Sequence, residues 1–348
     1  MPQLITATIP TPQEFQDLFG FDEPSGLFNN PQFRLVINKF GRCYWLLSVD
    51  NLQGPRFSGI NVYYQGNNAR LIRTIYPQAR RIIDVGANVG NNTIAYAEWA
   101  KNVEAFEPTP TTIKLLEANI SIAKLSKLKG TYWKGNSYTG SISRDENQES
   151  GWYKIRGVPQ PMDIIGTIFV QKYALSDQNG GNIWIQDHRG HGGHNFALED
   201  PSLSKKPNDL VKVERRTLDS FPQFKNVDVI KIDVEGHEWQ VLQGSKNLIK
   251  YQRPSVQVEI VRKQCARYRY SPEKIYKFFK DLDYVCVCSV RKPANQQQKE
   301  LGLFFGKELE MTHRDIPKYM DRLFVPREIF KKTDFSVMDK PIEEKKAA

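Results

Sequence analysis

The sequence predicts an α/β protein whose main domain is an open, largely parallel sheet of the Rossmann-like type. Short apolar runs that end in an acid recur along the chain, at Asp84, Glu107 and Asp233. Stretches with helical spacing of apolar residues lie between them, and the first run turns through two glycines into such a stretch. This alternation of strands and helices is typical of a parallel α/β domain.

Length and composition set the limits for this domain. With 348 residues, of which 40% are hydrophobic, the chain can form one large domain or a domain with an appendage. No run approaches the roughly 18 apolar residues of a membrane span, and the first residues lack the features of a signal peptide. Four cysteines without a C-x-x-C pair are expected to be reduced thiols. We therefore expect a cytoplasmic protein without a membrane span.

Residues 1–75 differ in composition from the rest of the chain. Prolines and two short alternating segments, 33–37 and 43–49, predict a small β-rich appendage. This appendage either covers one edge of the sheet or part of the active-site mouth, or it caps the edge without touching a substrate.

The main domain is expected over residues 76–326. The predicted strands are 81–84, 103–107, 168–176, 182–186, 210–216, 227–233 and 254–261, with a closing pair at 283–290 and 301–305. The predicted helices are 110–124, 237–250 and 271–282, the last with Ser271 as its N-cap. Residues 126–166 lack periodicity and predict an irregular insertion near the active site. Residues 327–348 are expected to form a charged tail whose end frays.

The turn after the first strand indicates the kind of ligand. It has the form D-x-G-x-x-x-G, from Asp84 to Gly90, and not the G-x-G-x-x-G of dinucleotide-binding folds. Gly86 permits a turn that a Cβ would strain, and Gly90 lets the backbone approach a ligand. Glu107 at the tip of the second strand is placed to bind ribose hydroxyls, whereas Asp84 would repel a pyrophosphate. This acid pair favours a ligand with a cation and a ribose, and S-adenosylmethionine carries both.

Acids also end later strands. Asp84, Glu107, Asp233 and Glu259 all fall at or near the carboxyl ends of predicted strands. Open parallel sheets bind their ligands at this edge. A purely structural sheet has no need of four acids there.

Several of these motifs resemble the FkbM-type family of S-adenosylmethionine-dependent methyltransferases. They are, in order over roughly residues 80–326, the segments 84–90, 105–108, 217–219, 230–238, 242–244, 258–259 and 323–326. The resemblance implies the Rossmann-like seven-stranded sheet of a class I methyltransferase and transfer of a methyl group, commonly to a hydroxyl. It implies a cofactor site formed by Asp84, Gly86, Asn88, Gly90 and Glu107, to which we add Ala174 as a candidate. It also places Asp233 beside the reacting methyl group.

Methyl transfer to oxygen requires an aligned acceptor and a base for the hydroxyl proton. His237 is the leading base, because the unperturbed pKa of histidine lies near neutrality, and Asp233 would hold the acceptor hydroxyl or the methionine amine. The structural alternative for His237 is a residue that caps backbone groups at the helix start. Glu235 and Glu259 could instead join Asp233 around a divalent ion such as Mg²⁺, which would polarise the hydroxyl.

A glycine-rich loop contains three more histidines, His188, His191 and His194. Without a cysteine partner they form a weak zinc pattern. We expect either a loop that contacts the substrate, with His194 as the second candidate base, or a solvated loop without a catalytic role.

Residues 262–280 contain seven basic residues and one acid, with aromatic residues between them, in a chain of net charge +10. Such a segment can bind a nucleic-acid backbone, a nucleotide-linked sugar or an acidic glycan, or it can form a solvated helix with its aromatics in the core. The function that we expect is O-methylation of a sugar, glycan or related small acceptor. The alternatives are ribose 2′-O-methylation of RNA and nucleoside binding without turnover.

Overall fold

We analysed the fold in a computed structural model of the chain. The structure describes residues 27, 33–37, 43–47, 66–125, 132–134, 142–144, 152–155, 166–187, 195–204, 206–287, 308–309 and 321–335. All structural statements below concern these residues.

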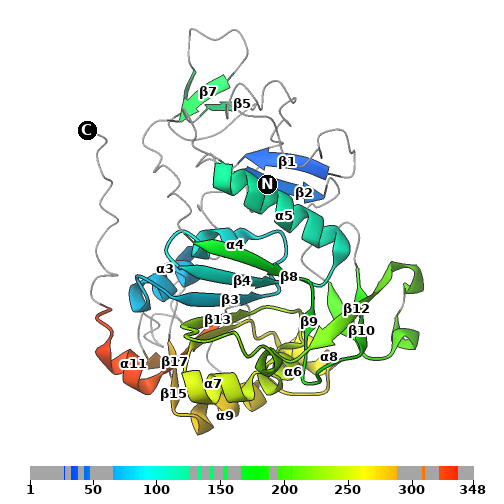
Figure 1. The fold of residues 1–348 in the computed structure, drawn as a ribbon, viewed down its shortest axis with the longest axis vertical. Coiled ribbons are helices and arrows are strands. Elements are labelled where there is room, and N and C mark those ends of the chain that lie inside the picture. The colour runs from blue at the N-terminus through cyan, green and yellow to red at the C-terminus, as the bar shows by residue number, and fades with distance from the viewer. Residues whose placement is uncertain are drawn as a thin grey trace, which may run out of the picture.

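One mixed sheet organises the fold, with the strand order β16-β15-β17-β14-β13-β3-β4-β8 (Figure 1). Its strands are β3 (Arg81–Val85), β4 (Asn102–Phe106), β8 (Thr167–Gln171), β13 (Val229–Ile232), β14 (Ser255–Val258), β15 (Tyr284–Val287), β16 (Glu308–Leu309) and β17 (Arg322–Pro326). The five strands from β8 to β14 run parallel, and β17 inserts antiparallel between β14 and β15. Without the two-residue β16, this is the seven-stranded Rossmann-like sheet that the sequence predicted.

Alternating side chains of the strands build a core on each face of the sheet. Ile82 packs on one face with α3 (Gly66–Ile75), α4 (Asn91–Tyr96) and α5 (Pro110–Leu125). Its neighbour Ile83 packs on the other with α6 (Glu238–Gln243), α7 (Lys246–Gln252) and α9 (Pro272–Asp281). The described residues also form the helices α8 (Arg262–Arg267) and α11 (Arg327–Lys332). The period of two along buried strands thus produces three layers.

Three smaller sheets accompany the main one. β9 (Ala174–Leu175), β10 (Asn182–Gln186), β11 (Phe196–Leu198) and β12 (Leu210–Arg216) form a sheet in the order β11-β10-β12-β9. Figure 1 shows β10 and β12 on the same side of the molecule as α6 and α8. β1 (Phe33–Ile37) and β2 (Cys43–Leu47) pair as the antiparallel strands expected in the N-terminal segment. Single 3₁₀ turns lie at Pro201–Leu203, Pro207–Asp209 and Leu218–Ser220.

The structure corrects the sequence prediction in three places. β5 (Tyr132–Lys134), β6 (Ile142–Arg144) and β7 (Trp152–Ile155) form an antiparallel sheet inside the stretch expected to be irregular. The strand expected at 168–176 is two strands, β8 and β9, in different sheets. The helix expected at 237–250 is divided into α6 and α7, because the carboxylate of Asp219 accepts the backbone N–H groups of Asn247 and Leu248 and starts a second helix.

Other expectations are met in part. α9 begins after Ser271 as predicted, but the Ser271 side chain makes no capping hydrogen bond. β15 confirms the first strand of the expected closing pair, and its partner in the main sheet is β17. The second expected strand, 301–305, lies outside the described residues. No helix in the described part of the chain is long and apolar enough to cross a membrane.

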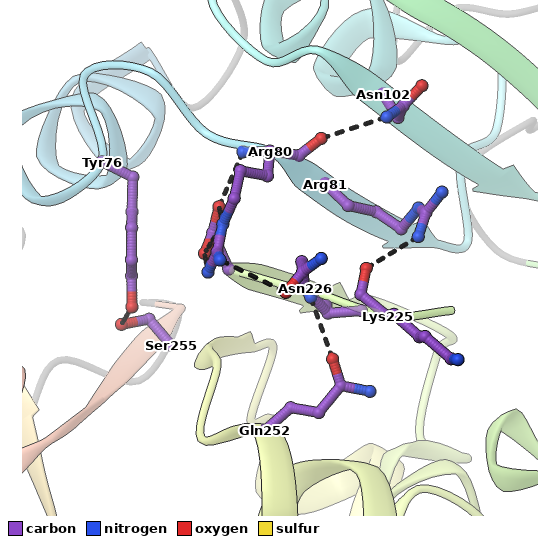
Figure 2. A network of polar contacts seen from close by, with 10 residues as sticks. Tyr76, Arg80, Arg81, Asn102, Lys225, Asn226, Gln252 and Ser255 are labelled. Carbon is purple, nitrogen blue, oxygen red and sulfur yellow. Dashed lines mark hydrogen bonds and ion pairs between the residues drawn. The ribbon is translucent and has the colours of Figure 1, made fainter. Parts of the chain in front are cut away.

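A polar network joins the amino-terminal ends of the central strands, opposite the edge where ligands are expected (Figure 2). Asp228, just before β13, accepts hydrogen bonds from the backbone N–H of Arg80 at 2.6 Å and from its guanidinium. Asn102 of β4 donates to the Arg80 carbonyl at 3.3 Å, and the Tyr76 and Ser255 hydroxyls lie 3.1 Å apart. These contacts tie the starts of β3, β4 and β13 together.

We expect Asp228→Ala to lower the free energy of unfolding, measured by urea titration, by about 1.5–3 kcal/mol. The Arg80 side chain is 62% exposed, so most of this loss comes from the backbone N–H that Asp228 accepts. Asp281→Ala is the control, because Asp281 forms an exposed i,i+4 pair with Lys277. Equal, small effects of both variants would mean that the network does not stabilise the sheet.

Candidate active site

A row of polar side chains crosses the centre of the sheet. Asp84 of β3, Lys231 of β13 and Gln257 of β14 are direct cross-strand partners. All three are buried, on the face covered by α3 and α4, because their neighbours Ile83, Ile230 and Val256 pack on the opposite face. Side chains alternate between the two faces, so the next position on this face is two residues further along the chain from each of the three. These positions are Gly86 after β3, Asp233 after β13 and Glu259 after β14. The row therefore leads directly to the carboxyl edge.

Lys231 links this row to the edge. Its ammonium lies 3.3 Å from Asp84 Oδ1 and 3.4 Å from Asp233 Oδ2, and it donates to the Gly86 carbonyl at 3.3 Å. Burial disfavours the charge, but Asp84 and Asp233 outweigh this cost and hold the pKa of Lys231 above its ordinary value. The other Asp84 oxygen accepts the Thr93 hydroxyl at 2.6 Å, so the Asp84 carboxylate is used inside the protein.

The glycine turn packs tightly against the protein itself. Gly86 has a φ of 79°, and a Cβ there would lie 1.9 Å from the Asp233 carbonyl oxygen. Gly90 has a φ of 93°, and a Cβ there would lie 2.7 Å from Leu116 of α5. The expected strain at Gly86 is confirmed. At Gly90 the close neighbour that the structure shows is a leucine, where the sequence analysis expected a ligand.

Glu107 braces this turn from the tip of β4. Its carboxylate accepts the backbone N–H of Asn88 at 3.1 Å and that of Thr109 at 2.9 Å. Burial raises the pKa of Glu107 above its ordinary value, and the charge of the nearby Asp187 adds to this effect. Each carboxylate oxygen can accept a second hydrogen bond, so Glu107 has acceptor capacity beyond its two backbone contacts. Asp187 follows β10 at the start of the glycine- and histidine-rich loop, and sequence analysis gave it no role.

Three acids meet at the tips of β13 and β14. Asp233, Glu235 and Glu259 each offer a carboxylate oxygen, and these oxygens lie within 4.8 Å of one another. Burial and the Asp233 charge raise the pKa of Glu235 to about 8. The same causes raise the pKa of Glu259 well above its ordinary value. The structure therefore brings together the trio that the sequence suggested as metal ligands.

Glu238 fixes the turn that carries two of these acids. Its carboxylate accepts the backbone N–H groups of Val234 at 3.1 Å and Gly236 at 3.0 Å, and the Tyr270 hydroxyl at 3.2 Å. Glu235 and Gly236 have φ values of 57° and 110°, so the turn is left-handed at both positions. Gln264 of α8 then donates to Glu235 Oε2 at 2.6 Å and orients that carboxylate.

His237 lies in the interior at the start of α6. Its residue is 3% exposed, its Nε2 lies 3.1 Å from the Ser176 hydroxyl, and its ring packs edge-on against Tyr268. Burial lowers the pKa of His237 to about 4, so the ring is neutral at pH 7. It makes no side-chain cap for α6. The contact with Ser176 ties this turn to the end of β9, and the role as a base stays a prediction.

Of the remaining candidates, one belongs to a smaller sheet and the other falls outside the described residues. Ala174 is buried in β9 and pairs with Arg215 of β12, so it belongs to the smaller sheet. His194 and the other two loop histidines lie outside the described residues. Sequence analysis also missed Lys231, although a lysine in the middle of an apolar strand signals a buried ion pair.

We expect Lys231→Met to lower the free energy of unfolding by about 3–5 kcal/mol, because it leaves two carboxylates without their shared cation. Urea titration measures this loss, and Lys101→Met, at an exposed lysine, is the control. The double variant with Asp84→Asn should recover part of the stability. A single variant as stable as the wild type would show that Lys231 does not hold these acids in place.

Comparison with known proteins adds a family. The methyltransferase FkbM domain model matches residues 84–286. No curated protein matches the chain at a significant level. Among solved structures, a methyltransferase FkbM from Methylobacillus flagellatus KT is 16% identical with a TM-score of 0.30, and the match covers 52% of this chain and 32% of that one. The chain thus spans about a third of the length of that protein.

Two further solved structures are similar over more of their length. A TehB-like SAM-dependent methyltransferase from Corynebacterium glutamicum is 9% identical with a TM-score of 0.35, covering 79% of this chain and 94% of that one. M. jannaschii TYW2 in complex with AdoMet is 10% identical with a TM-score of 0.33, covering 84% of each chain. The strand order and the turn from Asp84 to Gly90 are consistent with the family match, which covers residues 84–286. The chain belongs to the FkbM methyltransferase domain family.

Proposed function

We propose that the chain transfers a methyl group from S-adenosylmethionine to a hydroxyl group of a sugar, a glycan or a related small acceptor, in the cytoplasm. The observation that carries this proposal is the position of the Glu107-braced turn and the acids Asp233, Glu235 and Glu259 on the same edge of the sheet. The turn suits the nucleoside of the methyl donor, and the three acids suit a polar acceptor.

The residues at the turn fit S-adenosylmethionine. Glu107 is an acceptor for ribose hydroxyls, and the turn that it braces is preformed by hydrogen bonds to Asn88 and Thr109. The cofactor supplies a methyl group on a sulfonium, which is a cation. Acids in excess over Lys231 at this edge favour a cationic ligand over a pyrophosphate.

On the acceptor side, Asp233 and its neighbours hold and orient the hydroxyl. The reaction is an in-line displacement, so alignment of donor and acceptor contributes most of the rate. Asp233 is fixed by Lys231, and Glu235 by Gln264, so both carboxylates are oriented before a substrate binds. His237 is the candidate base from sequence, whereas its burial and its contact with Ser176 favour a positioning role.

Ribose methylation of RNA has weaker support. Four of the seven basic residues in 262–280 contact other parts of the described structure. Arg262 pairs with Glu273 and Lys277 with Asp281, while Arg267 lies over Phe196 and Lys274 over Trp239. Side chains engaged in this way form a weaker electrostatic surface for a phosphate backbone. Nucleic acid therefore stays the second candidate partner.

Calorimetric titration with S-adenosylmethionine tests the donor, and release of S-adenosylhomocysteine with a panel of hydroxyl acceptors tests the reaction. We expect micromolar donor binding and acceptor-dependent release. Absence of donor binding, with and without acceptors, would refute the proposal. Binding without turnover on any acceptor would favour a nucleoside-binding protein.

Glu107→Gln should weaken donor binding by about 1.5–3 kcal/mol, or roughly 10- to 150-fold in Kd, because a charge-assisted contact to the ribose is lost. The amide keeps one acceptor oxygen and can therefore retain one of the two backbone hydrogen bonds, whereas Glu107→Ala loses both. Calorimetry measures the change, with the exposed Glu117→Gln as control. An unchanged Kd would exclude Glu107 from the ribose site.

His237→Gln distinguishes a role of His237 as the general base from a role in packing against its neighbours. Because the ring is buried and joined to Ser176, we expect His237→Ala to lower the melting temperature and His237→Gln to keep turnover within about tenfold of the wild type. Loss of a general base costs about 10²–10⁴ in rate. A loss of that size in His237→Gln, with melting temperature and donor Kd unchanged, would identify His237 as the base.

A further inference from the structure

The three acids at the carboxyl edge converge because of the sheet itself. Asp233 follows β13 and Glu259 follows β14, and the Glu259 backbone N–H donates to Ile232 at 3.0 Å, so the two tips stay in register. Both side chains continue the polar row on the α3 and α4 face. Glu235 reaches the same place from the left-handed turn fixed by Glu238. Among the described residues, their ligand atoms lie within 4.8 Å of one another.

Glu259 is the member that points to a missing ligand. Its Oε2 is shielded from solvent and takes no hydrogen bond in the described structure. It also has no ion-pair partner among the described residues. A buried carboxylate oxygen without a donor is costly, and such atoms normally have a partner, an ordered water or an ion. Its place in the trio indicates that the partner binds between the three acids.

The balance of charge at this edge also favours a cation. Lys231 is within ion-pair distance of Asp233, but it is shared with Asp84. Arg267 of α8 donates to the Glu235 carbonyl at 3.0 Å and adds a second positive charge near the trio. The trio and Asp84 still offer more carboxyl groups than these two cations can pair with. A divalent ion between the three acids would offset the difference, which a neutral donor such as water cannot do.

The spacing of the oxygens suits an oxygen-liganded ion. Two ligands on opposite sides of an ion lie at twice the metal–oxygen distance, which is about 4.2 Å for Mg²⁺ and roughly 4.6–5.2 Å for Ca²⁺. All three oxygens lie within 4.8 Å of one another, which is no farther apart than two opposite ligands of Ca²⁺ can be, so one ion can contact all three. Carboxylates without histidine or cysteine select hard divalent ions over zinc.

We propose that Asp233, Glu235 and Glu259 bind one divalent cation of the Mg²⁺, Mn²⁺ or Ca²⁺ class, and that this ion receives the acceptor hydroxyl. The role of the ion toward the acceptor rests on the proposed methyl transfer, but ion binding does not. The ion polarises the O–H bond, so that the oxygen attacks the methyl carbon as the carbon–sulfur bond breaks and the hydroxyl proton leaves to solvent. An ion that binds the acceptor would also favour acceptors with a second oxygen close to the reacting hydroxyl, such as vicinal diols or hydroxy acids, because both oxygens can bind the ion.

Titration of the full chain with Mn²⁺, followed by the electron paramagnetic resonance signal of free Mn²⁺, tests the site without donor or acceptor. We expect one Mn²⁺ per chain, displaced by Mg²⁺ or Ca²⁺. Glu259→Gln and Glu235→Gln should each weaken binding by at least about tenfold. Glu117→Gln, an exposed glutamate on α5, should bind as the wild type does. Thermal melts in a chelator confirm that each variant is folded.

The outcomes separate the two proposals. No saturable binding, or equal binding by the wild type and both trio variants, overturns the metal site. If Mn²⁺ binds and calorimetry finds no donor binding, the site stands and the methyltransferase proposal fails. If donor binding rather than Mn²⁺ binding is lost in the trio variants, the acids hold the methionine ammonium and the metal site is refuted.

Discussion

The ammonium of Lys231 is the contact on which the rest of this edge depends. It lies in a strand whose other residues are apolar and buried, where an isolated charge would be prohibitively unfavourable. It is therefore stable only between Asp84 and Asp233. That requirement fixes the register of β3 against β13 and draws the Gly86 carbonyl toward the same point. The turn from Asp84 to Gly90 and the tip of β13 are consequently held as one unit.

The acids at this edge have the same chemistry and different roles because of their positions. Asp84 points inward and Glu238 holds the turn, so both are structural. Glu107 braces the turn and keeps acceptor capacity for the ribose contact that we propose. Glu235 and Glu259 converge with Asp233, and burial together with the Asp233 charge raises the pKa of both. Groups perturbed in this way are typical of ligand sites.

Local pattern was sufficient to predict most strands and the strand tips. The apolar runs that end at Asp84, Glu107 and Asp233 set the carboxyl edge, whereas the seven-stranded sheet was implied by the family resemblance. The antiparallel strand β17 between β14 and β15 was not predicted as a strand. What the sequence missed depends on contacts between distant segments. The division of α6 from α7 needs the Asp219 carboxylate, and the burial of His237 needs Ser176 from another sheet. Lys231 was overlooked because its partners become visible only when the register of β3 and β13 is known.

An acid-rich edge poses a problem for methyl transfer to a hydroxyl that the proposed ion would resolve. The sulfonium of the donor loses its charge in the transition state, so bare carboxylates nearby would stabilise the ground state more than the transition state. They would also oppose the negative charge that develops on the acceptor oxygen. The divalent ion that we propose between Asp233, Glu235 and Glu259 would oppose both effects, because its charge offsets most of the charge of the acids and would attract the developing alkoxide. On that proposal, the same three side chains would hinder the reaction when empty and assist it when they hold a cation.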